Sequence, residues 1–142
     1  MKKLIVSLLS LLILSSCWAD DVPPVVKSGF QSYIEKDLAA AFDVWMRGSA
    51  LEGDKTSRLQ LVGGLTQIES AYGKPQSYEV LASYDVSKRL KRIYAVSYHP
   101  KGPLFSYFDL FHTDSGEWVL YMFYFNTKPQ EILPRELIDK KG

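Results

Sequence analysis

Asp109 is the carboxylate of this sequence whose neighbours could support proton-transfer chemistry. It lies in an aromatic segment that runs from Phe105 to Phe111. Strict alternation along a strand places Phe105, Tyr107 and Phe111 on the same face as Asp109. In a pocket on that face, desolvation would raise the pKa of the carboxyl group and suit it to act as a general base. The alternative is an Asp109 on an exposed sheet face that pairs with a cation across a strand.

The aromatic residues near the C-terminal end of the chain form a second candidate site. In the segment 119–125 both faces of a strand would be apolar. One face must pack against other elements, and the other needs a second layer or a partner because monomers rarely expose large apolar patches. This pattern predicts a pocket for a small apolar ligand between sheet and helices, or a sheet surface for a protein partner or a second copy. The candidate ligand-binding residues are Tyr107, Phe111, Tyr121 and Phe123.

Metal and nucleophilic chemistry find little support in the sequence. His99 and His112 are the only histidines, and no His-x-His or Cys-rich cluster is present. Metal sites in proteins usually bring together three or four ligands, often at short spacings. No G-x-S-x-G motif marks a hydrolase nucleophile. We therefore expect no metal, no cofactor and two surface histidines, and the sequence favours a binding protein over an enzyme.

The only cysteine, Cys17, directly follows an apolar segment at the start of the chain. Lys2 and Lys3 precede eleven largely apolar residues, 4–14. A basic start followed by a short apolar run is typical of a secretory signal, and the run is too short to span a bilayer, which takes about 20 residues. The segment Leu14-Ser15-Ser16-Cys17 resembles a bacterial lipoprotein signal, in which the cysteine is lipidated and becomes the first residue.

This resemblance predicts a signal peptide at residues 1–16 and a lipid anchor at Cys17, which would hold the protein at a membrane of the cell envelope. The alternative is ordinary cleavage after Ala19, which would release a soluble periplasmic or secreted protein. Cleavage before Cys17 leaves 126 residues, enough for one domain with its own core. It also changes the formal charge from +1 to −1. A nearly neutral domain gives no support for nucleic-acid binding, which requires a basic surface.

The spacing of apolar residues predicts the elements that must position these side chains. Residues 17–24 read as a linker that ends at Pro23-Pro24. Helical spacing predicts one helix from Val25 to about Met46 and another from about Lys55 to Tyr72, ended by Gly73. Alternation with period two then predicts four strands at about 78–86, 93–99, 104–113 and 118–126. A tail begins at about residue 128, with a short helix after Pro134.

Helices followed by antiparallel strands predict an α+β fold, in which the N-terminal helices pack on one face of a curved four-stranded antiparallel sheet. Residues 25–142 would form this single domain. The order of elements, with a late hairpin that contains Trp118, resembles the NTF2-like, or cystatin-like, superfamily. Three segments are also similar to small exported bacterial proteins: Tyr72-Gly73-Lys74, Gly102-Pro103-Leu104-Phe105, and Phe125-Asn126-Thr127-Lys128-Pro129 followed by Ile132-Leu133-Pro134.

The resemblance implies a cone-shaped cavity between sheet and helices, in a superfamily that includes isomerases, dehydratases, accessory domains and binding modules. We expect an exported, lipid-anchored envelope protein that binds a small apolar ligand or a protein partner. The alternatives are a small isomerase-like or dehydratase-like enzyme with Asp109 as general base, and an accessory subunit of an envelope complex. The basic segment 88–92 would either touch anionic lipid, at about 1 kcal/mol per cation, or form a solvated hairpin tip.

Overall fold

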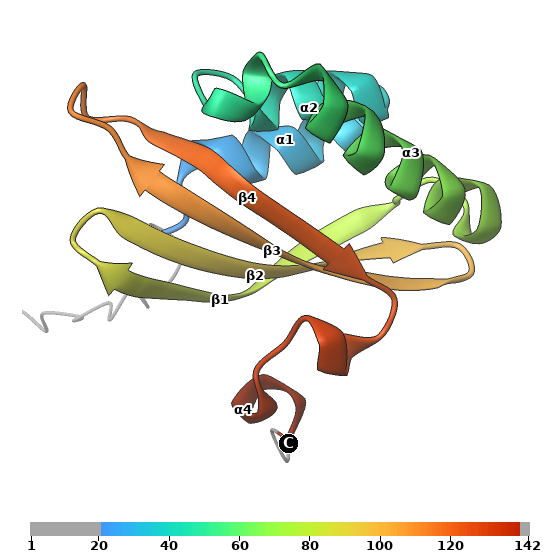
Figure 1. The fold of residues 1–142 in the computed structure, drawn as a ribbon. Coiled ribbons are helices and arrows are strands. Elements are labelled where there is room, and N and C mark those ends of the chain that lie inside the picture. The colour runs from blue at the N-terminus through green and yellow to red at the C-terminus, as the bar shows by residue number, and fades with distance from the viewer. Residues whose placement is uncertain (1–20, 140–142) are drawn as a thin grey trace, which may run out of the picture.

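The structure, a computed structural model, describes residues 21–139 (Figure 1). The predicted signal peptide and Cys17 lie outside the described residues. The helical elements are α1 (Pro24–Glu35), α2 (Leu38–Trp45), η1 (Ala50–Glu52), α3 (Lys55–Tyr72), η2 (Pro129–Glu131) and α4 (Arg135–Ile138). The strands are β1 (Ser77–Ser87), β2 (Leu90–His99), β3 (Gly102–His112) and β4 (Trp118–Asn126). Among the described helices none is long and apolar enough to cross a membrane.

The prediction of one helix from Val25 to Met46 was wrong, because the chain breaks at Lys36 and Asp37. The Asp37 carboxylate accepts a hydrogen bond from the Ala40 amide at 2.8 Å and so caps the start of α2. The apolar spacing continues across this break, which hides it from a periodicity argument. The linker also ends one residue earlier than predicted, because Pro24 is the first residue of α1, where proline is well tolerated.

Helices α1 and α2 approach each other closely at Gly29. A Cβ atom on Gly29 would lie 1.9 Å from Nε1 of Trp45, so only glycine fits at this position. The same indole N–H donates a hydrogen bond to the main-chain oxygen of Val26 at 3.3 Å. The large Trp45 ring is thereby held between the two helices and the sheet.

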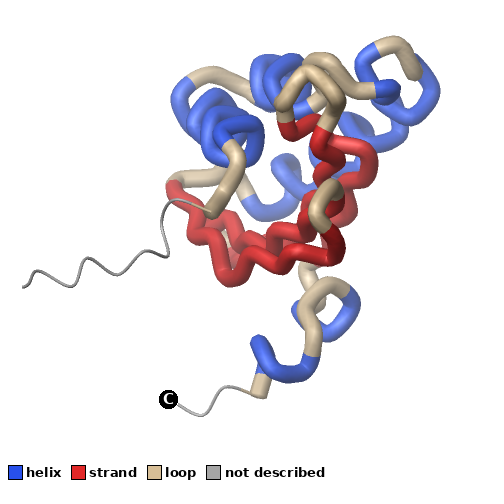
Figure 2. Tube along the Cα trace, turned by 90° about the vertical axis from the view of Figure 1, so that its left-hand side faces the viewer, coloured by secondary structure: helices blue, strands red, loops and turns tan. Residues whose placement is uncertain are grey.

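The four strands form one antiparallel sheet in the order β1-β2-β3-β4. Helices α1, α2 and α3 lie over one face, which we call the inner face, and the sheet curves without closing into a barrel (Figures 1 and 2). The C-terminal segment from η2 to α4 lies on the opposite, outer face. The α+β class, the helices on one face and the four antiparallel strands are therefore confirmed.

Aromatic side chains fill the space between the inner face and the helices. Phe108 on β3 and Phe123 on β4 lie 4.7 Å apart, between ring centroids, and Trp45 contacts both rings at 5.4 Å. Phe30 and Phe42 complete this cluster from α1 and α2. All five are nearly inaccessible to solvent. These rings occupy the part of the fold in which a cone-shaped cavity was expected.

The first described residues are held against the sheet by a buried lysine. Lys91 Nζ donates hydrogen bonds to the carboxylate of Asp21 and, at 3.1 Å, to its main-chain oxygen, and Asp85 lies 3.2 Å away. The ammonium group also stands over the ring of Trp118, 5.4 Å from its centroid. Burial lowers the pKa of Lys91, but the hydrogen bonds to Asp21 and Asp85 more than offset this and raise it overall. We call this contact the N-terminal clasp.

Candidate functional site

Asp109 and its aromatic neighbours lie on the outer face of the sheet. Residues directly opposite one another in antiparallel strands share a face, and here they form two rows across all four strands. The first row is Tyr84, Arg92, Asp109 and Met122. The second row is Ala82, Tyr94, Tyr107 and Tyr124. The predicted alternation along β3 is therefore confirmed for Tyr107 and Asp109, with the core residue Phe108 pointing the other way.

Asp109 forms a bidentate ion pair with Arg92, the residue directly opposite it on β2. Arg92 Nε and Nη2 donate to the two carboxylate oxygens, each at 2.6 Å. The hydrogen bonds to Asp109 raise the pKa of the Arg92 guanidinium, and the opposing effect of burial is smaller. The guanidinium carbon also lies 4.2 Å from the centroid of the Tyr107 ring. The predicted pairing of Asp109 with a cation across a strand is therefore confirmed. The expectation that this Asp109 would be exposed to solvent was wrong, because the residue is only 4% exposed.

This ion pair lies at a shallow groove, which we call the outer-face groove. Its volume is about 390 Å³, within the range of about 300–1,000 Å³ that is usual for small-molecule sites. The rings of Tyr84 and Tyr94 meet edge to face at 5.9 Å within it. The lining residues are Tyr84, Val86, Arg92, Tyr94, Asp109, Tyr121, Pro134 and Glu136.

The C-terminal segment supplies the wall of this groove and a second layer over part of the outer face. Ile132 and Leu133 are buried against Tyr94, and Phe105 and Tyr107 pack around them. The predicted short helix after Pro134 is confirmed as α4. The segment thus buries two apolar residues, Ile132 and Leu133, against an aromatic sheet surface of the same chain.

The outer face beside this segment remains uncovered. On β4, Tyr121 and Met122 are each 44% exposed and Tyr124 is 57% exposed. A bulge between Asp109 and Leu110 on one side and Met122 and Leu120 on the other leaves Tyr121 as an extra residue of β4. Tyr124 stacks on Tyr107 with a centroid distance of 5.8 Å. We call the exposed side chains of Tyr84, Tyr121, Met122 and Tyr124 the tyrosine surface.

The four predicted ligand-binding residues do not form one site. Tyr121 lines the outer-face groove, and Tyr107 lies next to it under Arg92. Phe111 lies farther along β3, where the Arg89 guanidinium covers its ring at 4.7 Å. Phe123 belongs to the core on the inner face, in contact with Trp45 and Phe108.

His99 was predicted at the surface, and this was wrong. The ring is buried between the ends of α3 and β2, where Nδ1 lies 2.7 Å from the main-chain oxygen of Gly73 and Nε2 lies 3.0 Å from Oγ of Ser97. A neutral ring that donates to Gly73 and accepts from the Ser97 hydroxyl satisfies both contacts. His112 lies beside Trp118, with ring centroids 4.8 Å apart. Within residues 21–139, no group of three or more His, Cys, Asp and Glu residues could hold a metal ion.

The basic segment 88–92 is largely neutralised by contacts within the domain. Arg89 pairs with Asp114 at 2.8 Å, Arg92 pairs with Asp109, and Lys91 belongs to the N-terminal clasp. These contacts explain why the cluster does not form a single basic patch. They also show which groove residue the sequence argument missed, namely Arg92. Centring the β2–β3 hairpin on the turn at Pro100 and Lys101 would have placed it opposite Asp109.

No protein-family model, curated protein or solved structure matches this chain. The assignment of function therefore depends on the geometry of the outer face and on the signal-like sequence predicted at residues 1–16.

Proposed function

We propose that this protein is an exported, lipid-anchored envelope protein whose single NTF2-like domain binds a protein partner through the tyrosine surface. The signal-like segment that ends at Cys17 supports export and anchoring, and the helices on a curved antiparallel sheet are compatible with the superfamily. The observation that carries the binding proposal is the exposed set of Tyr121, Met122 and Tyr124 on the edge strand β4.

The composition of this surface favours a polypeptide partner over a small apolar ligand. Tyrosine, methionine and arginine are enriched in protein interfaces, where rigid aromatic rings lose little conformational entropy on binding. The charge of Arg92 is already balanced by Asp109, so an apolar partner segment could cover it without leaving a single charge unpaired. The chain's own Ile132 and Leu133 already bind the adjoining part of the same face. An accessory subunit of an envelope complex would use the same surface.

One observation favours the alternative enzymatic function, a small isomerase or dehydratase. Asp109 is buried and lines a groove that also contains Tyr94 and Tyr121. However, both carboxylate oxygens accept hydrogen bonds from Arg92, so each oxygen keeps only one of its two lone pairs for a substrate proton. The geometry therefore favours binding over proton transfer.

We predict that Cys17→Ala abolishes membrane attachment. Acyl chains contribute about 0.8 kcal/mol per buried methylene, so loss of several chains removes the anchor completely. Intact-mass analysis of the mature protein and fractionation of host cells measure the effect. The wild-type protein should carry acyl mass on Cys17 and sediment with membranes, whereas the variant should be soluble. A wild-type chain that begins at Asp20 and carries no acyl mass would contradict anchoring.

We predict that Tyr124→Lys dissociates the complex in which the protein resides. A charged side chain at the centre of an aromatic interface must be desolvated, and loss of one interface tyrosine typically weakens binding by about 10-fold to 100-fold. Native electrophoresis of gently solubilised membranes measures the size of the complex. The matched control is Leu59→Lys on α3, where a comparably exposed apolar residue, 73% exposed, lies on the helical side. Equal behaviour of the two variants would count against the tyrosine surface.

A further inference from the structure

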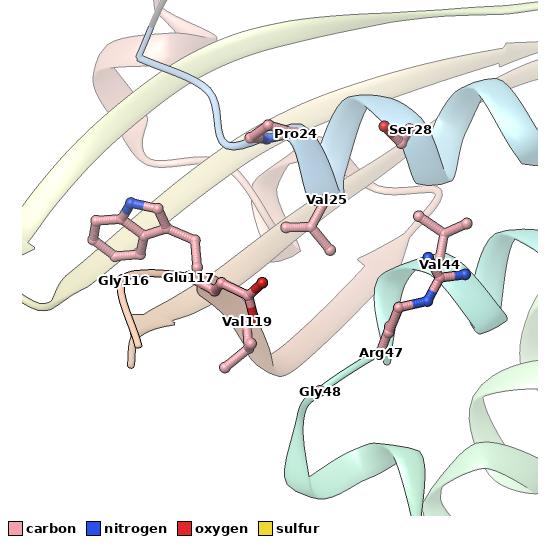
Figure 3. A pocket seen from close by; sticks show the side chains of 10 residues that line it. Pro24, Val25, Ser28, Val44, Arg47, Gly48, Gly116, Glu117 and Val119 are labelled. Carbon is pink, nitrogen blue, oxygen red and sulfur yellow. The ribbon is translucent and has the colours of Figure 1, made fainter. Parts of the chain in front are cut away.

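A second pocket lies at the opposite side of the sheet, where α1 and the end of α2 meet the β3–β4 hairpin (Figure 3). We call it the end pocket. Its volume is about 490 Å³. Val25 points into it from α1, and Val44 and Arg47 border it from the other side (Figure 3).

The lining is apolar at its centre and charged at its rim. Val25, Val44 and Trp118 supply apolar surface, whereas Arg47 and Glu117 are exposed side chains of opposite charge on facing walls. Across residues 21–139, neither of these two side chains forms a salt bridge. An apolar cavity with one unpaired cation and one unpaired anion at its rim matches a ligand with an apolar chain and a zwitterionic head group.

The size of the end pocket suits a ligand with one alkyl chain. A methylene group takes up about as much space as a water molecule, about 30 Å³ in the liquid. The volume of about 490 Å³ therefore accommodates about 16 such groups, which is enough for one alkyl chain of a lipid.

The position of the end pocket brings it close to the membrane. Pro24 lines the pocket, and the N-terminal clasp holds Asp21 against Lys91, which in turn contacts the pocket residue Trp118. Cys17 precedes Asp21 by four residues, so the chain can place the anchored cysteine no farther than about 14 Å from Asp21. With Cys17 anchored as proposed above, the pocket therefore stays within reach of the lipid surface.

We propose that the end pocket binds a single-chain zwitterionic phospholipid from that membrane, with its phosphate at Arg47, its ammonium group at Glu117 and its chain between α1, α2 and the hairpin. This inference relies on the proposed anchoring for the source of the ligand. The tyrosine surface is a separate site on the other face of the sheet.

Isothermal titration calorimetry with dodecylphosphocholine below its micellar concentration tests this proposal. The titrated protein is the full mature chain with Cys17→Ala, which keeps it out of membranes. We expect saturable binding of one molecule. Arg47→Gln should weaken binding by about tenfold, because a charge-assisted hydrogen bond to the phosphate is lost. The matched control, Arg135→Gln, removes an exposed arginine on α4 and should bind like the parent protein.

A second variant, Ser28→Trp, places a large ring in the end pocket from an exposed position on α1 and should abolish binding without lowering the unfolding midpoint. The proposal is overturned by an absence of saturable binding, by equal affinity of Arg47→Gln and its parent, or by equally strong binding of the uncharged decyl maltoside. The acyl mass on Cys17 is measured independently. Acyl mass on Cys17 of the wild-type protein, together with no binding by the Cys17→Ala protein in this titration, therefore rejects the end-pocket ligand and leaves the anchoring proposal intact.

Discussion

Arg92→Met should lower the free energy of unfolding by about 2–3 kcal/mol. The substitution leaves the buried Asp109 carboxylate without its two hydrogen-bond donors. Removing one partner of a buried ion pair typically costs about 3–5 kcal/mol. We expect a smaller loss here because the Arg92 side chain is 35% exposed and water partly screens the pair. Equilibrium unfolding in urea measures the effect as a lower midpoint at an unchanged slope.

The double variant Arg92→Met with Asp109→Leu is the control for this prediction. It replaces both charged groups with apolar side chains that remain packed against Tyr107, so no uncompensated charge stays buried. Replacing both partners of such a pair is often neutral or stabilising, and most of the lost stability should therefore return. A single variant as stable as the wild type would show that Asp109 does not depend on Arg92 and would reopen its assignment as a general base.

Gly29→Ala should destabilise the domain by about 3 kcal/mol or prevent it from folding. The new Cβ atom would overlap the Trp45 indole. This ring cannot move away, because Phe30, Phe108 and Phe123 enclose it. Extra methyl groups in a packed core cost about 1–3 kcal/mol, and occasionally more when rigid groups collide. This steric cost exceeds the gain of about 1 kcal/mol that alanine offers within a helix. Thermal unfolding followed by circular dichroism measures the change.

Gly63→Ala on α3 is the matched control, because a Cβ atom there meets no other atom within 4 Å. Without a steric penalty, alanine should stabilise the domain by about 0.5–1 kcal/mol through its helix propensity. Opposite signs at the two glycines would support the close packing of α1 on α2. A Gly29→Ala protein with wild-type stability would contradict that packing.

Most of the fold follows from local patterns in the sequence. Period-two alternation placed β4 at the bounds 118–126 that the structure shows, and the helix α3 begins at Lys55 and ends at Tyr72 as predicted. The apolar spacing did not predict the break between α1 and α2, because Ile34 and Leu38 keep the helical spacing across it. There the cap by Asp37 decides the structure, and a single aspartate among apolar residues is a weak signal.

The candidate site could be predicted only in part, because it combines residues far apart in the chain. Alternation identified the face that carries Tyr107 and Asp109. The partner of Asp109 is set by the register of β2 against β3, which a bulge or a turn shifted by one residue would change. Ile132 and Leu133 cover part of the outer face through a tertiary contact, and no periodicity in the tail predicts this contact. The burial of His99 likewise depends on a contact with Gly73, 26 residues earlier in the chain.

Site-specific photocrosslinking in living host cells tests the proposed function most directly. A photoreactive phenylalanine analogue replaces Tyr124 on the outer face or, as control, Leu59 on the helical side. Both positions are exposed, so the analogue should not disturb the fold. We predict one discrete protein adduct from position 124 and none of that size from position 59, and the adduct should stay in the membrane fraction. An adduct of twice the chain's mass would identify the partner as a second copy. No adduct from position 124, or the same adducts from both positions, would contradict the account.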